Sequence, residues 1–225
     1  MRIVGGQEAV PHDHSFLVAI FDRGSLSCGG SLIDTTWVLT AAHCLEGKSS
    51  GALTIYTSRH RINRPANVDN PECADSIPAA ALFSHSQYNV HNLVYDIALI
   101  ELARPPKCVT QIAMPSLDAS GFRGNLAKLA GWGSLGEDRR SPSRLQEATV
   151  EIISRERCLS LLQPVGDSPI IPSQICAGLE SGVNACYGDS GGPLFYDPED
   201  PSEPPLQIEL ITVLVHSYSP VISRY

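Results

Sequence analysis

Short apolar runs rich in β-branched residues recur along the whole chain, and this pattern constrains the fold more than any other feature. Clusters of Gly, Pro, Ser and Asn separate the runs. Many short strands with turn signals between them predict an all-β barrel or sandwich. No repeat of fixed period is present, which disfavours propellers and solenoids. The runs lie at residues 15–21, 31–42, 52–57, 96–102, 125–132, 145–153 and 206–215.

Between these runs, the sequence shows few helical signals and one clear connector. The best helical signal covers residues 154–162, with Ser154 as the N-cap. The proline-rich segment "LARPPKC" (102–108) lies near the middle of the chain and is typical of a connector between two β units. The segments 139–143 and 196–205 are charged or rich in proline, so we expect solvated loops there.

Charge and cysteine content narrow the functional classes. The formal net charge is -8, with 16 Lys and Arg. The sequence therefore lacks the excess of positive charge that is typical of nucleic-acid binding. The apolar stretches are short and broken by polar residues, and we expect no membrane span. Seven cysteines without a CxxC pair indicate a disulfide framework and hence a secreted protein. The chain begins with "MRIVGG" and shows no signal-peptide pattern there, so we expect either that a leader has been removed or that the chain starts at the mature domain.

The stretch "ACYGDSGGP" (185–193) combines an acid, a hydroxyl nucleophile, three glycines and a proline. These residue types are also the commonest in ordinary turns. A serine flanked by glycines is therefore a turn residue unless other parts of the chain supply a base and an orienting acid.

His43 and Asp96 are the candidates for that base and acid. His43 ends the run "WVLTAAHC", and Asp96 opens "DIALIEL", where a carboxylate is costly unless paired. Taken singly, each is more typical of a structural histidine and of a residue that starts a strand. Acyl transfer requires a hydroxyl, an imidazole that takes its proton, and a carboxylate that holds the imidazole. The order His43, Asp96, Ser190 is the order found in chymotrypsin.

Six motifs resemble those of the trypsin/chymotrypsin-like serine endopeptidases, peptidase family S1. The resemblance implies two packed six-stranded antiparallel β-barrels with the active site between them, and we expect the closing C-terminal helix of the family to be missing. Residues 3–106 would form the N-terminal barrel and 107–225 the C-terminal barrel, together one peptidase S1 domain. The motifs are "IVGG" (3–6), "CGGSLIDTTWVLTAAHC" (28–44), "DIALIEL" (96–102), "AGWGS" (130–134), "QICAG" (174–178) and "CYGDSGGPL" (186–194).

On this resemblance, His43 is the general base, Asp96 orients it, and Ser190 attacks the peptide carbonyl. The backbone N–H groups of Gly188 and Ser190 form the oxyanion hole. Gly188 has no Cβ, which lets the backbone approach the carbonyl oxygen. Removing one oxyanion donor typically raises the barrier by on the order of 3 kcal/mol.

The resemblance also implies a substrate pocket. Its base is Asn184, six residues before the nucleophile, where trypsin-like members carry an aspartate. Because Asn184 has no charge, we expect neutral or apolar P1 residues rather than Arg or Lys. The best alignment assigns the pocket wall to Ser217, Tyr218 and Ser219, and an alternative register puts His216 in the aromatic position.

Three residues resemble the activation device of the family. Cleavage after Arg2 would free the α-ammonium of Ile3, which inserts beside Asp189 and orders the oxyanion loop. A buried carboxylate needs a positive partner, which is the physical reason for such a switch. The chain with Met1 and Arg2 attached is then a weakly active precursor.

The family's disulfides account for four of the seven cysteines. The resemblance implies the bridges Cys28–Cys44 and Cys158–Cys176, and we pair Cys73–Cys108 by elimination. Cys186 is then left without a partner, because the family's partner cysteine is absent downstream.

The sequence therefore predicts a secreted, monomeric serine endopeptidase that needs no cofactor or metal. Its partners would be protein or peptide substrates and protein inhibitors of proteases. Two metal alternatives are weaker: His12 and His14 lack a third ligand, and the acidic segment 67–75 lacks alternating oxygen ligands. The rival functions are a non-catalytic homologue that acts as a binding module, and a truncated product that folds poorly.

Overall fold

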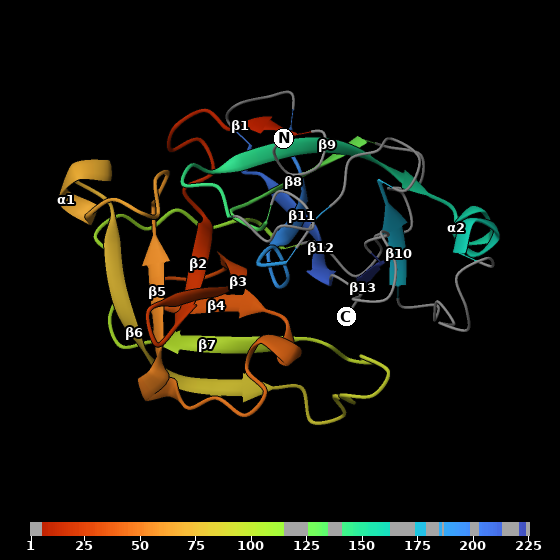
Figure 1. The fold of residues 1–225 in the computed structure, drawn as a ribbon, viewed down its shortest axis with the longest axis horizontal. Helices are drawn as coiled ribbons and strands as arrows, with labels where there is room; N and C mark the ends of the chain where they lie inside the picture. Colours follow the sequence, from red (N-terminus) through yellow and green to blue (C-terminus); the bar gives the residue numbers. More distant parts are fainter. Residues whose placement is uncertain are drawn as a thin grey trace.

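The computed structural model describes most of the chain. The described residues are 6–114, 126–134, 141–162, 174–178, 185, 187–198, 203–212 and 221–223. Two bodies of antiparallel strands lie side by side, with strands β2 to β7 on the left and β8 to β13 on the right in Figure 1.

The first body is a closed barrel of six strands in the order β2-β3-β4-β7-β6-β5. Side chains of β5 and β7 alternate between buried and half-buried, the period expected of strands with one face toward a core. Its core contains Ile20, Ile55, Ile77 and Ile100, all fully buried. The strands are β2 (Leu17–Asp22), β3 (Ser25–Leu32), β4 (Trp37–Thr40), β5 (Leu53–Thr57), β6 (Asp75–Ser84) and β7 (Ala98–Leu102).

The second body is a seven-stranded sheet in the order β1-β9-β10-β13-β12-β11-β8. Strand β8 also pairs with β9 along its whole length, so six of these strands run around a ring. This arrangement confirms the prediction of an all-β protein with two six-stranded barrels. The strands are β1 (Gln7–Glu8), β8 (Leu126–Gly131), β9 (Gln146–Ile153), β10 (Gln174–Ala177), β11 (Pro193–Tyr196), β12 (Leu206–Thr212) and β13 (Val221–Ser223).

An apolar cluster separate from the barrel cores lies between the two barrels and joins them. It includes Phe16 and Leu17 from the first barrel and Trp132 and Phe195 from the second, all buried. The rings of Phe16 and Phe195 pack edge to face with 5.2 Å between centroids. Strand β1 adds to this joint, since it precedes the first barrel in the chain but pairs with β9 of the second. The division of the chain after residue 106 stays a prediction.

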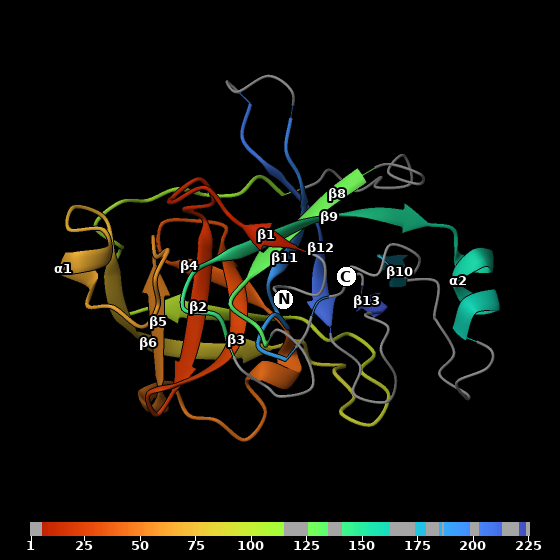
Figure 2. The ribbon, with the colours of Figure 1, turned by 45° about the horizontal axis from the view of Figure 1, so that its top comes forward.

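Two helices lie at opposite ends of the molecule (Figures 1 and 2). Helix α2 (Arg155–Leu162) confirms the predicted helix, and the Arg157 N–H donates a 3.1 Å hydrogen bond to Ser154 Oγ, as an N-cap requires. The four-residue helix α1 (Ala66–Asp69) was not predicted. No helix among the described residues is both long and apolar enough to cross a membrane.

One predicted run and several strands differ from the prediction. The strands β1, β6, β10, β11 and β13 lie outside the predicted runs. The run at 31–42 covers the end of β3, a turn and β4, because Trp37 N–H bonds back to the Asp34 carbonyl. Strand β6 was missed because Pro78 argues against a central strand. A bulge between Ala79 and Ala81 accommodates it.

Candidate active site

His43 lies in a single 3-10 turn (Ala42–Cys44) that directly follows β4. The disulfide Cys28–Cys44 ties this turn to β3. The imidazole is 25% exposed, so one edge of the ring faces solvent. The turn is therefore fixed by a strand on one side and a covalent bridge on the other.

Asp96 holds both the ring and the backbone of His43. Its Oδ2 lies 2.7 Å from His43 Nδ1, and its Oδ1 accepts a 2.8 Å hydrogen bond from the His43 backbone N–H. The Asp96 side chain is fully buried. Because a carboxylate only accepts, this contact keeps the proton on Nδ1 and leaves Nε2 as the basic nitrogen.

The backbone before Asp96 is bent by residues that rarely adopt this conformation. Leu93 and Tyr95 have φ values of 53° and 55°, in the left-handed region that disfavours large side chains. The Ile97 N–H closes a tight turn onto the Tyr95 carbonyl at 2.8 Å. The Tyr95 ring stacks on His85 at 4.7 Å. This turn positions the Asp96 carboxylate next to His43.

Ser190 lies on a loop that packs against the first barrel. Its carbonyl accepts a 2.8 Å hydrogen bond from the Gly29 N–H of β3, and the residue is 7% exposed. The sulfur of Cys44 lies 3.7 Å from His43 Nε2 and 3.6 Å from the Ser190 carbonyl oxygen. His43 and Ser190 thus both contact one sulfur atom, although they come from different barrels.

Gly191 shows why this loop requires glycine. Its φ is +81°, and a Cβ there would lie 2.2 Å from Thr40 Oγ1 and 2.7 Å from the Gly29 carbonyl oxygen. Any other residue would push the loop away from the first barrel. Gly188, with φ +96°, is a second position of the loop whose backbone conformation favours glycine.

Asp189 is buried at 1% exposure, in a cradle that the sequence analysis did not identify. Its Oδ1 accepts a 2.8 Å hydrogen bond from the Gly133 N–H. A Cβ on Gly131 or Gly133 would lie 2.1 Å or 2.3 Å from the carboxylate. The two glycines of "GWG" therefore provide the space for Asp189, and their spacing around Trp132 was the available signal.

The remaining predicted site residues lie outside the described part of the chain. They are the pocket residues Asn184, Ser217, Tyr218 and Ser219, the activation residues Arg2 and Ile3, and the cysteine Cys186. The three bridges Cys28–Cys44, Cys73–Cys108 and Cys158–Cys176 are present in the structure.

The predicted alternatives for metal binding find other partners in the structure. His14 bonds to Glu147 at 2.7 Å, whereas His12 faces Asn70, so the two imidazoles do not converge on one point. In the acidic segment 67–75, Arg59 engages Asp69 and Arg104 engages Asp75. Cys28, His43 and Cys44 offer ligand atoms within 4.8 Å, but both sulfurs are in a disulfide and cannot act as thiolates.

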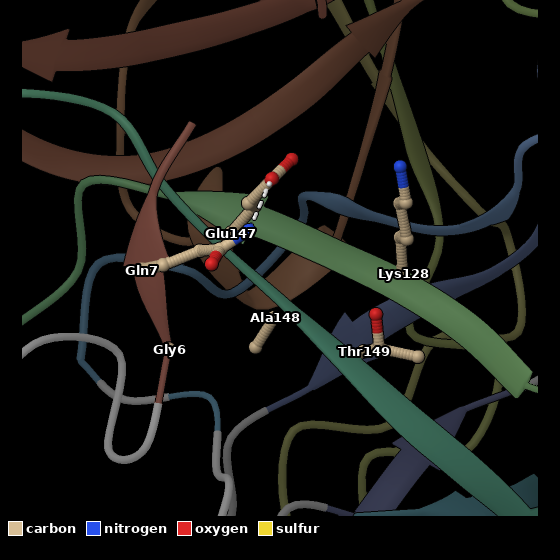
Figure 3. A pocket seen from close by; sticks show the side chains of 6 residues that line it. All are labelled: Gly6, Gln7, Lys128, Glu147, Ala148 and Thr149. Atoms are coloured by element: carbon tan, nitrogen blue, oxygen red, sulfur yellow. Dashed lines mark hydrogen bonds between the residues drawn. The ribbon is translucent and has the colours of Figure 1, made fainter. Parts of the chain in front are cut away.

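A polar pocket of about 360 Å³ lies apart from these residues, beside strand β1. Figure 3 shows Gln7 and Glu147, joined by a 3.1 Å hydrogen bond, at one end and Lys128 with Thr149 at the other. Glu147 is also held by His14, and Lys128 by Asp197. The two charged groups of the pocket thus have ion-pair partners outside it, and Gly6 and Gln7 of the N-terminal segment line one part of it.

Comparisons with known proteins agree with this geometry. The protein-family model described as Trypsin matches residues 3–218. Coagulation factor XII of Sus scrofa is 36% identical over 211 residues, which covers 88% of this chain and 33% of the relative. Coagulation factor XII of Rattus norvegicus is 36% identical over 206 residues, covering 87% of this chain and 33% of the relative.

Serine protease 56 of Homo sapiens is 34% identical over 197 residues, covering 86% of this chain and 31% of the relative. The chain therefore spans about a third of the length of the curated relatives it matches. Since the family model covers nearly the whole chain and the two barrels are present, the chain belongs to the trypsin family of serine peptidases.

Proposed function

We propose that the chain is a secreted serine endopeptidase whose catalytic residues are His43, Asp96 and Ser190. The observation that carries the proposal is the double hydrogen bond from His43 to the buried Asp96, at 2.7 and 2.8 Å. Nothing in an ordinary β-barrel requires a buried carboxylate to hold both the ring and the backbone of a partly exposed histidine. Acyl transfer does require it.

These contacts support the acyl-transfer mechanism of the family, with the other roles assigned by resemblance. Ser190 Oγ attacks the peptide carbonyl while His43 Nε2 takes its proton, and Asp96 stabilises the imidazolium that forms. The backbone N–H groups of Gly188 and Ser190 bind the oxyanion, a contribution of on the order of 3 kcal/mol per donor. His43 then gives the proton to the leaving amine. Water, activated by His43, hydrolyses the acyl-enzyme.

Activation and substrate choice extend the proposal. Cleavage after Arg2 would free Ile3 to pair with the Asp189 carboxylate, which lies in the glycine cradle at 1% exposure. Asn184 would form an uncharged base of the S1 pocket, so protein substrates would be cut after neutral or apolar residues. The three disulfides and the relatives named coagulation factor XII support secretion.

Capture by a fluorophosphonate probe tests the proposal. We expect covalent labelling of chain cleaved after Arg2, with the label on Ser190 by mass spectrometry and none on a Ser190→Ala variant. A folded, monodisperse protein that is not labelled would favour the rival function of a binding module. An aggregated protein that is not labelled would favour a truncated product.

A further inference from the structure

The loop between β5 and β6 carries a second Arg-Ile bond. The dipeptide occurs twice in the chain, at Arg2–Ile3 and at Arg61–Ile62. The loop, which contains α1, lies at the edge of the first barrel (Figure 1). Arg61 is exposed and Ile62 is half-buried. A protease that recognises the first bond by its sequence would meet the same residue pair on this surface.

In the structure, both polar groups of the second bond are held in hydrogen bonds. The Arg61 carbonyl accepts hydrogen bonds from the Arg64 N–H at 3.2 Å, which makes a turn, and from Arg59 Nη2 at 3.1 Å. The Ile62 N–H donates to the Ser143 carbonyl at 3.1 Å. Both polar groups of the peptide bond are therefore engaged, and cleavage requires the segment to open locally.

A buried ion pair controls this opening. The side chains of Arg59 and Asp69 are each 2% exposed, with Nε and Oδ2 3.1 Å apart. Asp69 also accepts the backbone N–H groups of His60 and Arg61, both at 2.8 Å. Arg59 reaches the Arg64 carbonyl as well as that of Arg61. Removing one partner of such a pair leaves the other charge buried and unpaired, which loosens the whole turn.

The position of the bond decides what a cut would do. His43 precedes it, whereas Asp96 and Ser190 follow it. Strands β2 to β5 would belong to one piece, and β6 and β7 to the other. The bridge Cys28–Cys44 lies wholly before the bond, and the bridges Cys73–Cys108 and Cys158–Cys176 lie wholly after it. Both cysteines of the first piece are used in its own bridge, so no disulfide joins the two pieces.

We propose that Arg61–Ile62 is a latent cleavage site for arginine-specific proteases, kept closed by the Arg59–Asp69 pair, whose hydrolysis separates His43 from Asp96 and Ser190. In the cut, water adds its hydroxyl to the Arg61 carbonyl carbon and its proton to the Ile62 nitrogen as the peptide bond breaks. The site is thus an irreversible off-switch. That consequence rests on the proposed function, whereas the cleavage itself does not.

The test uses the full chain with Ser190→Ala, so that its own proposed activity cannot contribute, and an added arginine-specific protease. Mass spectrometry follows the new N-terminus at Ile62. We expect Arg59→Gln to raise its rate of appearance about ten- to a hundredfold, the factor for losing a charged hydrogen-bonded pair. Arg59→Gln with Arg61→Gln should give none. The bond Arg64–Pro65 is an internal control, because the proline after it blocks cleavage in every variant.

Equal rates at Arg61 with and without Arg59→Gln, in folded proteins, would overturn the inference. If the Arg59→Gln variant does not fold, the rate of cleavage at Arg61 is measured instead in the protein that keeps Arg59, at increasing concentrations of urea. Cleavage at Arg61 that rises below the global unfolding midpoint supports local opening, and cleavage that only follows global unfolding overturns it. On a non-reducing denaturing gel the 1–61 piece should separate. A piece that stays linked also overturns the inference.

Chain with Ser190 intact separates the two proposals. Loss of fluorophosphonate capture in step with the cut supports the off-switch. Failure to capture the probe in chain that is cleaved after Arg2 but intact at Arg61 counts against the proposed function. The rates of cleavage at Arg61 still decide the inference.

Discussion

The carboxylate of Asp189 accepts a 2.8 Å hydrogen bond from the Gly133 N–H, and it lies where a side chain on Gly133 would be. Asp189 directly precedes the proposed nucleophile, so this contact couples the loop 131–133 to the geometry of Ser190. The relationship joins residues 56 positions apart in the chain.

Gly133→Ala should therefore disturb both stability and activity. The new Cβ would lie 2.3 Å from the Asp189 carboxylate, an overpacking that costs about 1–3 kcal/mol. We expect a lower Tm and weaker fluorophosphonate capture. Gly51→Ala is the matched control, because nothing lies within 4 Å of its Cβ. Equal effects of both substitutions would show that the cradle does not constrain Asp189.

Cleavage after Arg2 should raise peptidase activity sharply, because it supplies the proposed cationic partner of Asp189. Asp189→Asn should remove most of this gain while the chain stays folded, since the amide cannot pair with an ammonium. The measurement is kcat/KM before and after a cut that mass spectrometry has verified. Arg2→Gln, which blocks the cut, is the control. Unchanged activity after a verified cut would show that Asp189 is not the switch.

Asp96→Asn should lower kcat by about 10⁴-fold with little change in KM. The amide preserves the shape of the buried side chain but offers His43 Nδ1 a different hydrogen-bonding pattern, which favours the wrong tautomer. Steady-state kinetics on a peptide substrate measure the effect. A thermal unfolding curve close to that of the unsubstituted chain would show that the loss is not due to unfolding. A loss of less than tenfold would contradict the assigned role.

Acid should destabilise the protein through three carboxylates with lowered pKa values. Hydrogen bonds from Arg144 and then His60 lower the pKa of Glu8, and the Arg104 guanidinium lowers that of Asp75. Burial alone would raise the pKa of Glu147, but hydrogen bonds from His14 and Gln7 outweigh it, so this pKa lies below its ordinary value. Each group stabilises the folded state above its unfolded pKa and loses this contribution as pH falls through its folded pKa.

Glu147→Gln should make the free energy of unfolding less dependent on pH in that acidic range. At pH 7 it should cost about 1–3 kcal/mol, the value of a hydrogen bond to a charged group. Urea denaturation at pH 7 and pH 3 measures the difference. Thr149→Ala on the exposed face of the same strand serves as the control. A variant with the same pH dependence as the unsubstituted chain would rule out a contribution from Glu147.

Cys186 should react as a free thiol in the denatured, non-reduced monomer. The three bridges of the structure use six of the seven cysteines, so one equivalent of thiol reagent is expected per chain. Cys186→Ser should reduce the count to zero, which identifies the reacting residue. Zero equivalents in the unsubstituted monomer would mean that the chain pairs its cysteines differently.

The sequence by itself determined the class of fold and many of its strands. The runs at 52–57 and 145–153 became β5 and β9 because apolar alternation has the period of an extended backbone, which is a local property. The Ser154 hydroxyl likewise predicted the start of α2 through a contact only three residues away. The order of His43, Asp96 and Ser190 could also be read directly from the chain.

Only the tertiary structure decided which distant groups meet. The His14–Glu147 pair and the extended path of β6 through Pro78 left no readable local pattern, and the glycines at 131 and 133 did not indicate that Asp189 is the group between them. Their partners lie tens to more than a hundred residues apart in the chain. Such contacts depend on how two barrels pack, where volume and charge must match in three dimensions, whereas periodicity along the chain reports only which face of a strand is buried.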